Sequence, residues 1–345
     1  MLAQHQKNPK IKNPSWELFT TIEHEVLEVR SSLLGELDRV SPKISIAAKE
    51  MLDDKLMKVN TPLLGELFPW IIQDITGLDK DVTKRVAVGW LALYIYTIFL
   101  DEYLDGKKEI SPEEFLAGSL LAKIGLLNLH EIVIGTKFQN VFDDALIVSA
   151  DGQLHDVVFK SKQKNMFDLE DTAKKKNYLL MTCASALAAL SDENSEVIIE
   201  FAMSLLLIFQ YLDDLADWEE DIHDKRITLV FEQLSEYLSE IDFVQVFELS
   251  HDQVLERLIS SGSLIRVLNR ISELLSSSLM TIATINYQQD KSPSWKFFLS
   301  LEQELNHLQS ILGGIENSFS SLPVSERVRI TEEVEKSIII IAQQS

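Results

Sequence analysis

Long segments with apolar residues at helical spacing, rarely interrupted by glycine or proline, constrain the fold of this chain most strongly. Its 345 residues include only 12 glycines and 8 prolines, and these gather at a few places. No run of alternating apolar and polar residues competes for a strand. The pattern predicts an all-α protein, with helices near residues 15–38, 43–58, 62–76, 80–104, 112–127, 138–163, 167–190, 195–222, 228–239, 248–285, 293–316 and 323–343.

The chain carries no internal repeat, low-complexity tract or Gly/Ser linker, so nothing in the sequence separates two domains. We expect one helical domain over residues 1–290. Residues 291–345 follow a Lys-Ser-Pro break and are expected to form a helical extension packed on the same domain.

A formal net charge of −22 excludes some partners and favours others. It repels nucleic acid and anionic membrane surfaces but attracts divalent cations. The single cysteine, Cys183, excludes an intramolecular disulfide, which suits a cytoplasmic protein. The N-terminus has no apolar stretch of signal-peptide length, and the longest apolar runs, 90–100 and 201–209, are too short to span a bilayer. We therefore expect no transmembrane segment.

The sharpest motif is acidic and follows the apolar run 201–209. Asp213, Asp217 and Asp221 are spaced by four residues, which places three carboxylates on one face of a helix. Carboxylates that continue the line of a buried helix repel one another and lose solvation unless a cation neutralises them. The spacing therefore predicts metal ligands.

A second acidic pair, Asp101 and Asp105, has the same spacing and follows the apolar run 90–100. Either acidic run, taken alone, is also typical of a solvated helix end. Together they predict two acid pairs that face each other across a helical bundle. Ligands that offer only oxygen favour a hard cation such as Mg²⁺, which also binds substrate phosphates.

These residues resemble the class I isoprenoid synthases, the helical superfamily of trans-prenyl diphosphate synthases, terpene synthases and squalene/phytoene synthases. Residues 209–221, with Phe-Gln before the aspartates, resemble the second aspartate-rich motif of the prenyl diphosphate synthases. They also match the terpene synthase triad in outline, with Asp217 in place of Ser/Thr and Asp221 in place of Glu. Asp101 and Asp105 match the first motif, although Glu102 departs from it toward the phytoene synthase form.

The resemblance covers roughly residues 62–231 and implies a single large antiparallel bundle with a central active-site cavity. It implies two or three Mg²⁺ ions and a prenyl diphosphate substrate, and it leaves a homodimer open. The implied metal ligands are Asp101, Asp105, Asp213, Asp217 and Asp221, and all but Asp221 are also the candidate catalytic residues. The implied substrate-binding residues are Lys176, Lys225 and Arg226 for the diphosphate, and Tyr96, Phe99, Phe209 and Gln210.

Several of these residues have a plainer structural interpretation. Lys225 and Arg226 are equally typical of a helix C-terminus, where cations are favoured. Aromatic residues such as Tyr96 and Phe99 often only fill a core, although aromatic faces also stabilise carbocations.

The reaction type is less constrained by the sequence. Chain-elongating members of the superfamily carry a second basic cluster for isopentenyl diphosphate. Here the segment before Pro62 keeps at most Lys58 of that cluster, and after Asp105 come only Gly106, Lys107 and Lys108. This favours a terpene synthase that acts on one substrate as a lyase. A chain-elongating prenyltransferase, a head-to-head squalene/phytoene-type synthase and a non-enzymatic scaffold remain alternatives. One feature opposes the lyase: no arginine occurs between Arg85 and Arg226, where terpene synthases place one.

Overall fold

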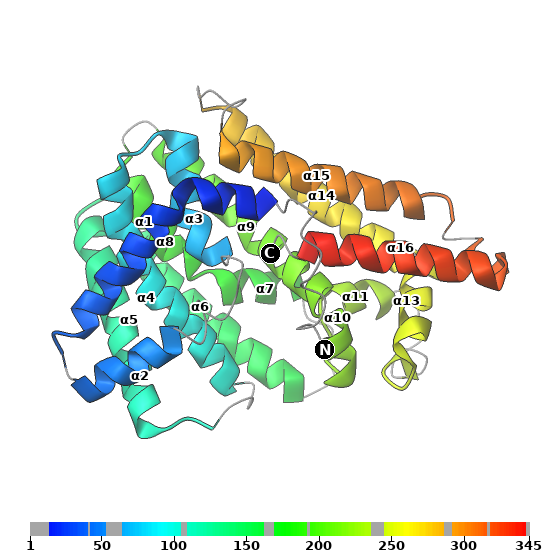
Figure 1. Cartoon of the computed structure of the whole chain (residues 1–345), viewed down its shortest axis with the longest axis horizontal. Coiled ribbons are helices and arrows are strands. Elements are labelled where there is room, and N and C mark those ends of the chain that lie inside the picture. The colour runs from blue at the N-terminus through cyan, green and yellow to red at the C-terminus, as the bar shows by residue number, and fades with distance from the viewer. Residues whose placement is uncertain are drawn as a thin grey trace. The chain divides into compact units, whose positions relative to one another are not determined.

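The structure is a computed structural model, and it describes residues 14–40, 42–52, 64–104, 109–161, 169–191, 194–235, 245–285, 292–315 and 318–342. These residues form helices joined by turns and short connections, and none of them lies in a strand (Figure 1). The all-α prediction is confirmed.

The chain divides into two compact units. The first comprises residues 1–131, 287–300 and 344, and the second comprises residues 132–286, 301–343 and 345. The helices that lie in the first unit are α1 (Pro14–Leu37), α2 (Pro42–Leu52), α3 (Leu64–Thr76), α4 (Lys80–Leu104) and nearly all of α5 (Pro112–Val133). Helix α15 (Pro293–Leu312) begins in the first unit and ends in the second.

The second unit holds the remaining described helices. They are α6 (Gln139–Ser161), α7 (Leu169–Asn177), α8 (Leu180–Ala189), α9 (Ser195–Ala216), α10 (Trp218–His223), α11 (Leu229–Ser235), α13 (His251–Ser260), α14 (Ser263–Ala283), the 3₁₀ helix η4 (Phe319–Ser321) and α16 (Val324–Ala342).

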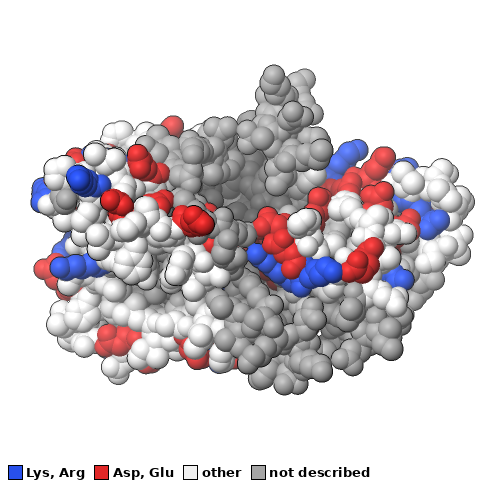
Figure 2. Space-filling view, turned by 90° about the horizontal axis from the view of Figure 1, so that it is seen from below, with Lys and Arg blue, Asp and Glu red and all other residues white. Residues whose placement is uncertain are grey.

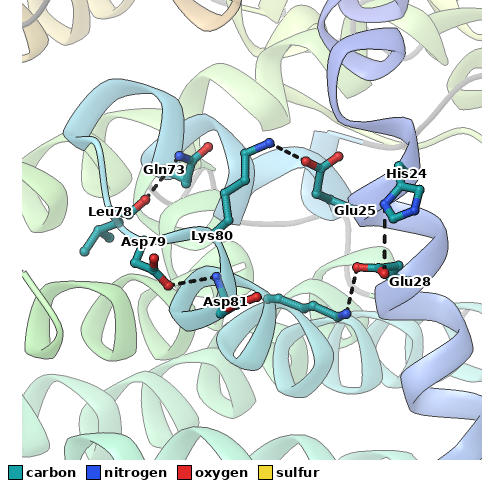
Figure 3. Close-up of polar contacts among 9 residues, drawn as sticks. His24, Glu25, Glu28, Gln73, Leu78, Asp79, Lys80 and Asp81 are labelled. Atoms are coloured by element: carbon teal, nitrogen blue, oxygen red, sulfur yellow. Dashed lines mark hydrogen bonds and ion pairs between the residues drawn. The ribbon is translucent and has the colours of Figure 1, made fainter.

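Helix α1 is fastened to α3 and α4 in the first unit. Arg30 on α1 donates two hydrogen bonds to the buried carboxylate of Glu66 on α3, from Nε to Oε1 and from Nη2 to Oε2, both at 2.7 Å. At the surface, Nζ of Lys84 on α4 lies 2.7 Å from Oε2 of Glu28, and a second ion pair joins Lys80 to Glu25 (Figure 3). The buried fork stabilises this packing more than the exposed pairs do.

Close packing of α4 against α5 depends on glycine. A Cβ atom added to Gly125 on α5 would lie 2.7 Å from the carbonyl oxygen of Gly89 on α4 and 2.8 Å from Cβ of Leu93. Helices approach this closely only where one of them lacks a side chain. The contact fixes α4, whose last turn carries Asp101.

Helices α8 and α9 form the core of the second unit. Residues 180–188 of α8 are all buried, as expected of a helix with small and apolar residues on every side. Helix α8 packs against α6 and α9, and α9 also packs against α7, α14 and α16. This surrounded helix carries the second acidic motif at its C-terminal end.

Three predicted helices are interrupted. The helix expected at 167–190 tightens around Tyr178, whose N–H donates to the carbonyl of Lys175 at 3.1 Å and whose carbonyl accepts from the N–H of Met181 at 2.9 Å. The helix expected at 195–222 breaks at Asp217, whose φ and ψ are −101° and 8°. The helix expected at 248–285 divides at Gly262, whose φ of 69° is left-handed and suits glycine.

Three described helices, α4, α5 and α9, are long and apolar enough to cross a membrane, judged by length and composition only. In α4 and in α9, 56% of the most apolar 18-residue segment is buried inside the protein. In α5 the buried share of this segment is only 33%. The expected absence of a transmembrane segment is therefore not confirmed and stays a prediction. Acidic side chains gather in several patches on the face drawn in Figure 2, some beside basic ones, as the net charge of −22 leads one to expect.

Candidate active site

The second acidic motif spans the end of α9 and the start of α10. Asp213 and Asp217 are exposed, whereas Asp221 is buried. Although the helix breaks at Asp217, the N–H of Asp217 donates to the carbonyl of Asp213, and the N–H of Asp221 donates to that of Asp217, both at 2.9 Å. The four-residue spacing thus persists through the bend, but not on one straight helix face as predicted.

The neighbouring Asp214 points into the protein. Its Oδ1 accepts a 2.6 Å hydrogen bond from Nε2 of Gln210, and its Oδ2 accepts a 2.8 Å hydrogen bond from the N–H of Leu229. The amide of Gln210 thus positions Asp214, and its predicted role in substrate binding stays a prediction. This buried carboxylate fastens the start of α11 to α9, because Leu229 is the first residue of α11.

Burial and crowding of like charges change the acidity of this cluster. Burial, together with the charge of Asp213, raises the pKa of Asp214 to about 7. The hydrogen bonds from Gln210 and Leu229 oppose this rise but do not cancel it. Burial, together with the charges of Asp214, Asp217 and Asp213, raises the pKa of Asp221 to about 8, and Arg226 only partly offsets this rise. The four carboxylates therefore lie within electrostatic reach of one another, and burial adds to the cost of ionising Asp214 and Asp221.

Helix α7 brings Lys176 to this cluster. The positive charge of Lys176 lowers the pKa of Asp214, so the two side chains interact electrostatically. The following residue, Asn177, donates from Nδ2 to Oε1 of Gln210 at 3.0 Å and to the carbonyl of Leu206 at 3.3 Å. Gln210 in turn donates to Asp214, so a chain of hydrogen bonds links the end of α7 to the second acidic motif. Diphosphate binding by Lys176 stays a prediction.

Close packing of α6 against α7 sets the position of Lys176. A Cβ atom added to Gly152 on α6 would lie 2.3 Å from the backbone nitrogen of Lys176 and 2.4 Å from the carbonyl carbon of Lys175. Oγ of Ser149 also donates to the carbonyl of Lys176 at 3.2 Å. The backbone of α7 is thus pressed onto α6, and only glycine fits at residue 152.

The two basic residues after the motif differ in their surroundings. Lys225 is exposed, has a φ of 56°, and its Nζ lies 2.5 Å from Oε1 of Glu248. Arg226 is half-buried, its N–H donates to the carbonyl of Asp221 at 2.8 Å, and its Nη2 lies 3.1 Å from Oδ2 of Asp224. Arg226, unlike Lys225, thus contacts the backbone of Asp221, and its charge also lowers the pKa of that residue. Diphosphate binding by either residue stays a prediction.

The first acidic motif lies at the end of α4, in the first unit. Asp101 is half-buried, and Asp105 lies outside the described residues. The expected approach of Asp101 and Asp105 to Asp213 and Asp217 stays a prediction, as does the central cavity.

The aromatic residues among the candidate substrate-binding residues are buried to different degrees. Phe99 is buried with its ring against Gly118 of α5, where an added Cβ would lie 2.8 Å from it, while Tyr96 and Phe209 are half-buried. Trp90 stacks on Tyr94 at 5.6 Å and donates from Nε1 to the carbonyl of Gly65 at 2.6 Å.

The residues of the second motif suit Mg²⁺. Asp213 and Asp217 are exposed and offer carboxylate oxygens, and Asp221 offers a third, whose pKa is raised first by burial and then by the charges of Asp214, Asp217 and Asp213. Magnesium prefers oxygen ligands of this kind and usually retains several waters.

Sequence reasoning missed two residues that organise this site, Asp214 and Gly152. Asp214 follows Leu207 and Tyr211 by seven and three residues, and both are buried, so helical spacing alone could have assigned it to the inner face. Gly152 is a lone glycine inside a helix, a pattern that often marks a close backbone approach, although no sequence signal names its partner.

The all-α fold of this chain is similar to the fold of solved prenyl diphosphate synthases and polyprenyl synthases. No model of a protein family matches the sequence, and no curated protein matches it. Among solved structures the similarity is extensive in fold and low in sequence.

Three of these structures illustrate the similarity. A geranylgeranyl pyrophosphate synthetase from the archaeon Geoglobus acetivorans is 18% identical with a TM-score of 0.67, over 84% of this chain and 99% of that one. A polyprenyl synthase from Caulobacter crescentus, complexed with calcium and isoprenyl diphosphate, is 16% identical with a TM-score of 0.64, over 84% and 97%. A heptaprenyl diphosphate synthase from Staphylococcus aureus is 16% identical with a TM-score of 0.64, over 83% and 98%. The chain thus has the fold of these enzymes along nearly their whole length.

Proposed function

We propose that this protein is a Mg²⁺-dependent enzyme that ionises an allylic prenyl diphosphate, and that it acts as a chain-elongating prenyl diphosphate synthase. The observation that carries the proposal is the chain of hydrogen bonds from Asn177, the residue after Lys176, through Gln210 to Asp214, which links the end of α7 to the acidic residues 213–221. A bound cation and an ammonium group side by side suit a diphosphate, because together they neutralise the negative charge of its phosphate groups.

The chain's own residues divide this work. Asp213, Asp217 and Asp221 would hold Mg²⁺, Asp101 and Asp105 of the first motif are proposed as further ligands, and Lys176 would bind the diphosphate. When bound, Mg²⁺ supplies Lewis-acid stabilisation of the negative charge that develops on the departing diphosphate. Asp214 keeps the motif in place through Gln210 and Leu229.

The choice of a prenyltransferase over a terpene synthase rests on the similar structures, whose names are those of prenyl diphosphate synthases. The sequence alone favoured the lyase, because the basic residues for a second diphosphate are sparse. Those positions, Lys58, Lys107 and Lys108, lie outside the described residues. The missing arginine before the second motif also agrees better with a prenyltransferase.

The test is to incubate the purified protein with Mg²⁺ and allylic diphosphates of increasing chain length, each with and without isopentenyl diphosphate. We expect longer prenyl diphosphates only when both substrates are present, and no product from Asp213→Asn. Hydrocarbon or alcohol products without isopentenyl diphosphate would instead identify a terpene synthase. No consumption of any allylic diphosphate would contradict an enzymatic function.

We further propose a homodimer in which α5 contributes to the interface. Phe115, Leu116 and Leu127 of α5 are 61%, 51% and 59% exposed, which is unusual for large apolar side chains. Leu116 and Leu127 lie about three turns apart and therefore on the same face. Sedimentation of the protein should give a dimer, and the paired substitutions Leu116→Lys and Leu127→Lys should give a monomer; an unchanged dimer would exclude this face.

A further inference from the structure

Three helices of the second unit bring one imidazole and three carboxylates together, and none of these carboxylates is one of the predicted metal ligands. His251 begins α13, and its Nδ1 lies 3.4 Å from Oδ1 of Asp252 and 3.5 Å from Oε1 of Glu335 on α16. One ligand atom from each of these three residues lies within 4.8 Å of the other two. Nε2, on the opposite side of the ring, lies 2.8 Å from Oε1 of Glu219 on α10.

Helix stability explains only part of this cluster. Asp252 lies in the first turn of α13, where the helix dipole favours a carboxylate in any protein. Glu219 likewise lies in the first turn of α10, whereas Glu335 lies inside α16, where the helix dipole gives no such reason. Glu335 is crowded: burial and the charges of Glu219, Asp252 and Glu332 raise its pKa, and His251 only partly opposes them. One imidazole cannot balance these carboxylates.

The spacing of the ligand atoms suits a small first-row metal ion. Two ligands about 2.0–2.1 Å from a tetrahedral zinc lie about 3.4 Å apart, close to the 3.4 and 3.5 Å that separate Nδ1 from the two carboxylate oxygens. Imidazole nitrogen selects zinc over magnesium, which prefers oxygen alone. We propose that Nδ1 of His251 and one oxygen each from Asp252 and Glu335 bind Zn²⁺, with water as the fourth ligand.

The far side of the imidazole supports this arrangement. A histidine that binds metal through one nitrogen usually donates the other N–H to a carboxylate, which fixes the tautomer and strengthens the ligand. Nε2 is buried and makes no hydrogen bond within the described part of the chain, although Glu219 is only 2.8 Å away, because the N–H is out of line with the carboxylate. Glu219 is 66% exposed, so its side chain is free to turn into line with Nε2.

The scaffold around His251 is already ordered. The ring of His251 packs on buried Trp218 of α10, with centroids 4.3 Å apart and planes inclined by 34°. The N–H of Ser250 donates to Oε1 of Gln253 at 3.0 Å and fixes the start of α13. Bound zinc would therefore tie α13 directly to α16, and, through Glu219, to the helix that carries Asp221.

Zinc binding is tested on the full-length protein carrying Asp213→Asn and Asp217→Asn, which disable the acidic motif. The protein is dialysed against Zn²⁺ in excess Mg²⁺, and bound zinc is measured by plasma mass spectrometry. We expect about one zinc per chain. We also expect its loss in His251→Ala and a 10- to 100-fold weaker affinity in Glu219→Gln, as typical for the partner of a metal-bound histidine.

The matched control is His223→Ala, which removes an 88% exposed histidine whose Nδ1 also lies near a carboxylate, 3.1 Å from Oδ1 of Asp224. This variant should retain the zinc. Glu335→Gln serves as a second variant if His251→Ala does not fold, and it should remove the absorption bands of tetrahedral Co²⁺ bound in place of zinc. No zinc in the parent protein, or equal zinc in the His251 and His223 variants, would overturn the proposal.

Discussion

The guanidinium of Arg270 on α14 donates two hydrogen bonds to the carboxylate of Glu170 on α7, from Nε to Oε1 at 2.7 Å and from Nη2 to Oε2 at 2.9 Å. The hydroxyl of buried Tyr211 on α9 donates to the same Oε1 at 2.8 Å. The guanidinium holds the pKa of Glu170 below its usual range. One carboxylate therefore joins the helix of Lys176, the helix of the acidic motif and α14.

Arg270→Lys tests this junction, because lysine retains the charge but cannot make two parallel hydrogen bonds. We expect the free energy of unfolding to fall by about 1–2 kcal/mol, with the exposure of Arg270 limiting the loss. Urea denaturation measures it. Arg329→Lys is the control, since Arg329 is 66% exposed and only 3.4 Å from Glu333 along one helix, and it should change stability by less than about 0.5 kcal/mol. Equal effects would contradict the special role of the Glu170 junction.

Gly152→Ala should both destabilise the protein and weaken diphosphate binding. The new methyl group meets backbone atoms of Lys175 and Lys176, which cannot rotate away, so α7 must shift. Overpacking of this kind typically costs about 1–3 kcal/mol.

The control for Gly152 is Gly35→Ala in α1. No atom lies within 4 Å of the added Cβ there, and alanine in a helix should raise stability by about 0.5–1 kcal/mol. Thermal melts and pyrophosphate binding by calorimetry check both variants. A Gly152→Ala protein as stable as the parent would show that α6 and α7 can separate at little cost.

Asp213 and Asp214 should give opposite phenotypes although they are neighbours. Asp213→Ala should abolish turnover at saturating Mg²⁺ and leave the metal-free protein as stable as before or slightly more stable, because it removes a like-charge repulsion. Asp214→Ala should cost about 1–3 kcal/mol of stability, because Gln210 and the N–H of Leu229 lose their buried acceptor. Substantial activity in Asp213→Ala would refute its role as a ligand.

The metal-free protein should lose stability as the pH rises from about 5 to about 8. The pKa values of Asp214 and Asp221 are raised to about 7 and about 8, so in this window the folded state binds more protons than the unfolded state. Each carboxyl group that ionises therefore favours unfolding. Excess Mg²⁺ should flatten the slope because a bound cation favours the ionised form. Melting temperatures measured between pH 5 and pH 8 test this prediction. A melting temperature of the metal-free protein that rises with pH would contradict the raised pKa values of Asp214 and Asp221.

Tyr96→Ala tests whether the half-buried Tyr96, about one turn before Asp101, limits the length of the bound chain. If its ring is the floor of the cavity, removing it opens space for an apolar chain, and the products should lengthen by one or more isoprene units. Product analysis by mass spectrometry measures the change. An unchanged chain-length profile in an active variant would assign Tyr96 to the core.

Sequence reasoning identified the helices well because helical periodicity and capping are local. Helices α1, α4 and α9 begin within a residue of their predicted starts. The acidic motif could also be identified from local sequence, because three aspartates at helical spacing after an apolar run indicate a cation site. The breaks at Asp217 and Gly262 were not foreseen, since periodicity continues through a bend when the flanking turns remain helical.

The sequence by itself determined the all-α class, the helix that carries the acidic motif, and the residue types that favour Mg²⁺. Helical spacing places Asp214 on the inner face, but the tertiary structure alone decided that it accepts a hydrogen bond from the N–H of Leu229 on α11. It also decided that Gly152 meets Lys176, that Arg270 meets Glu170 and that His251 meets Glu335. These contacts join residues 24 to 100 positions apart, and such pairings depend on how helices pack, which no local pattern encodes.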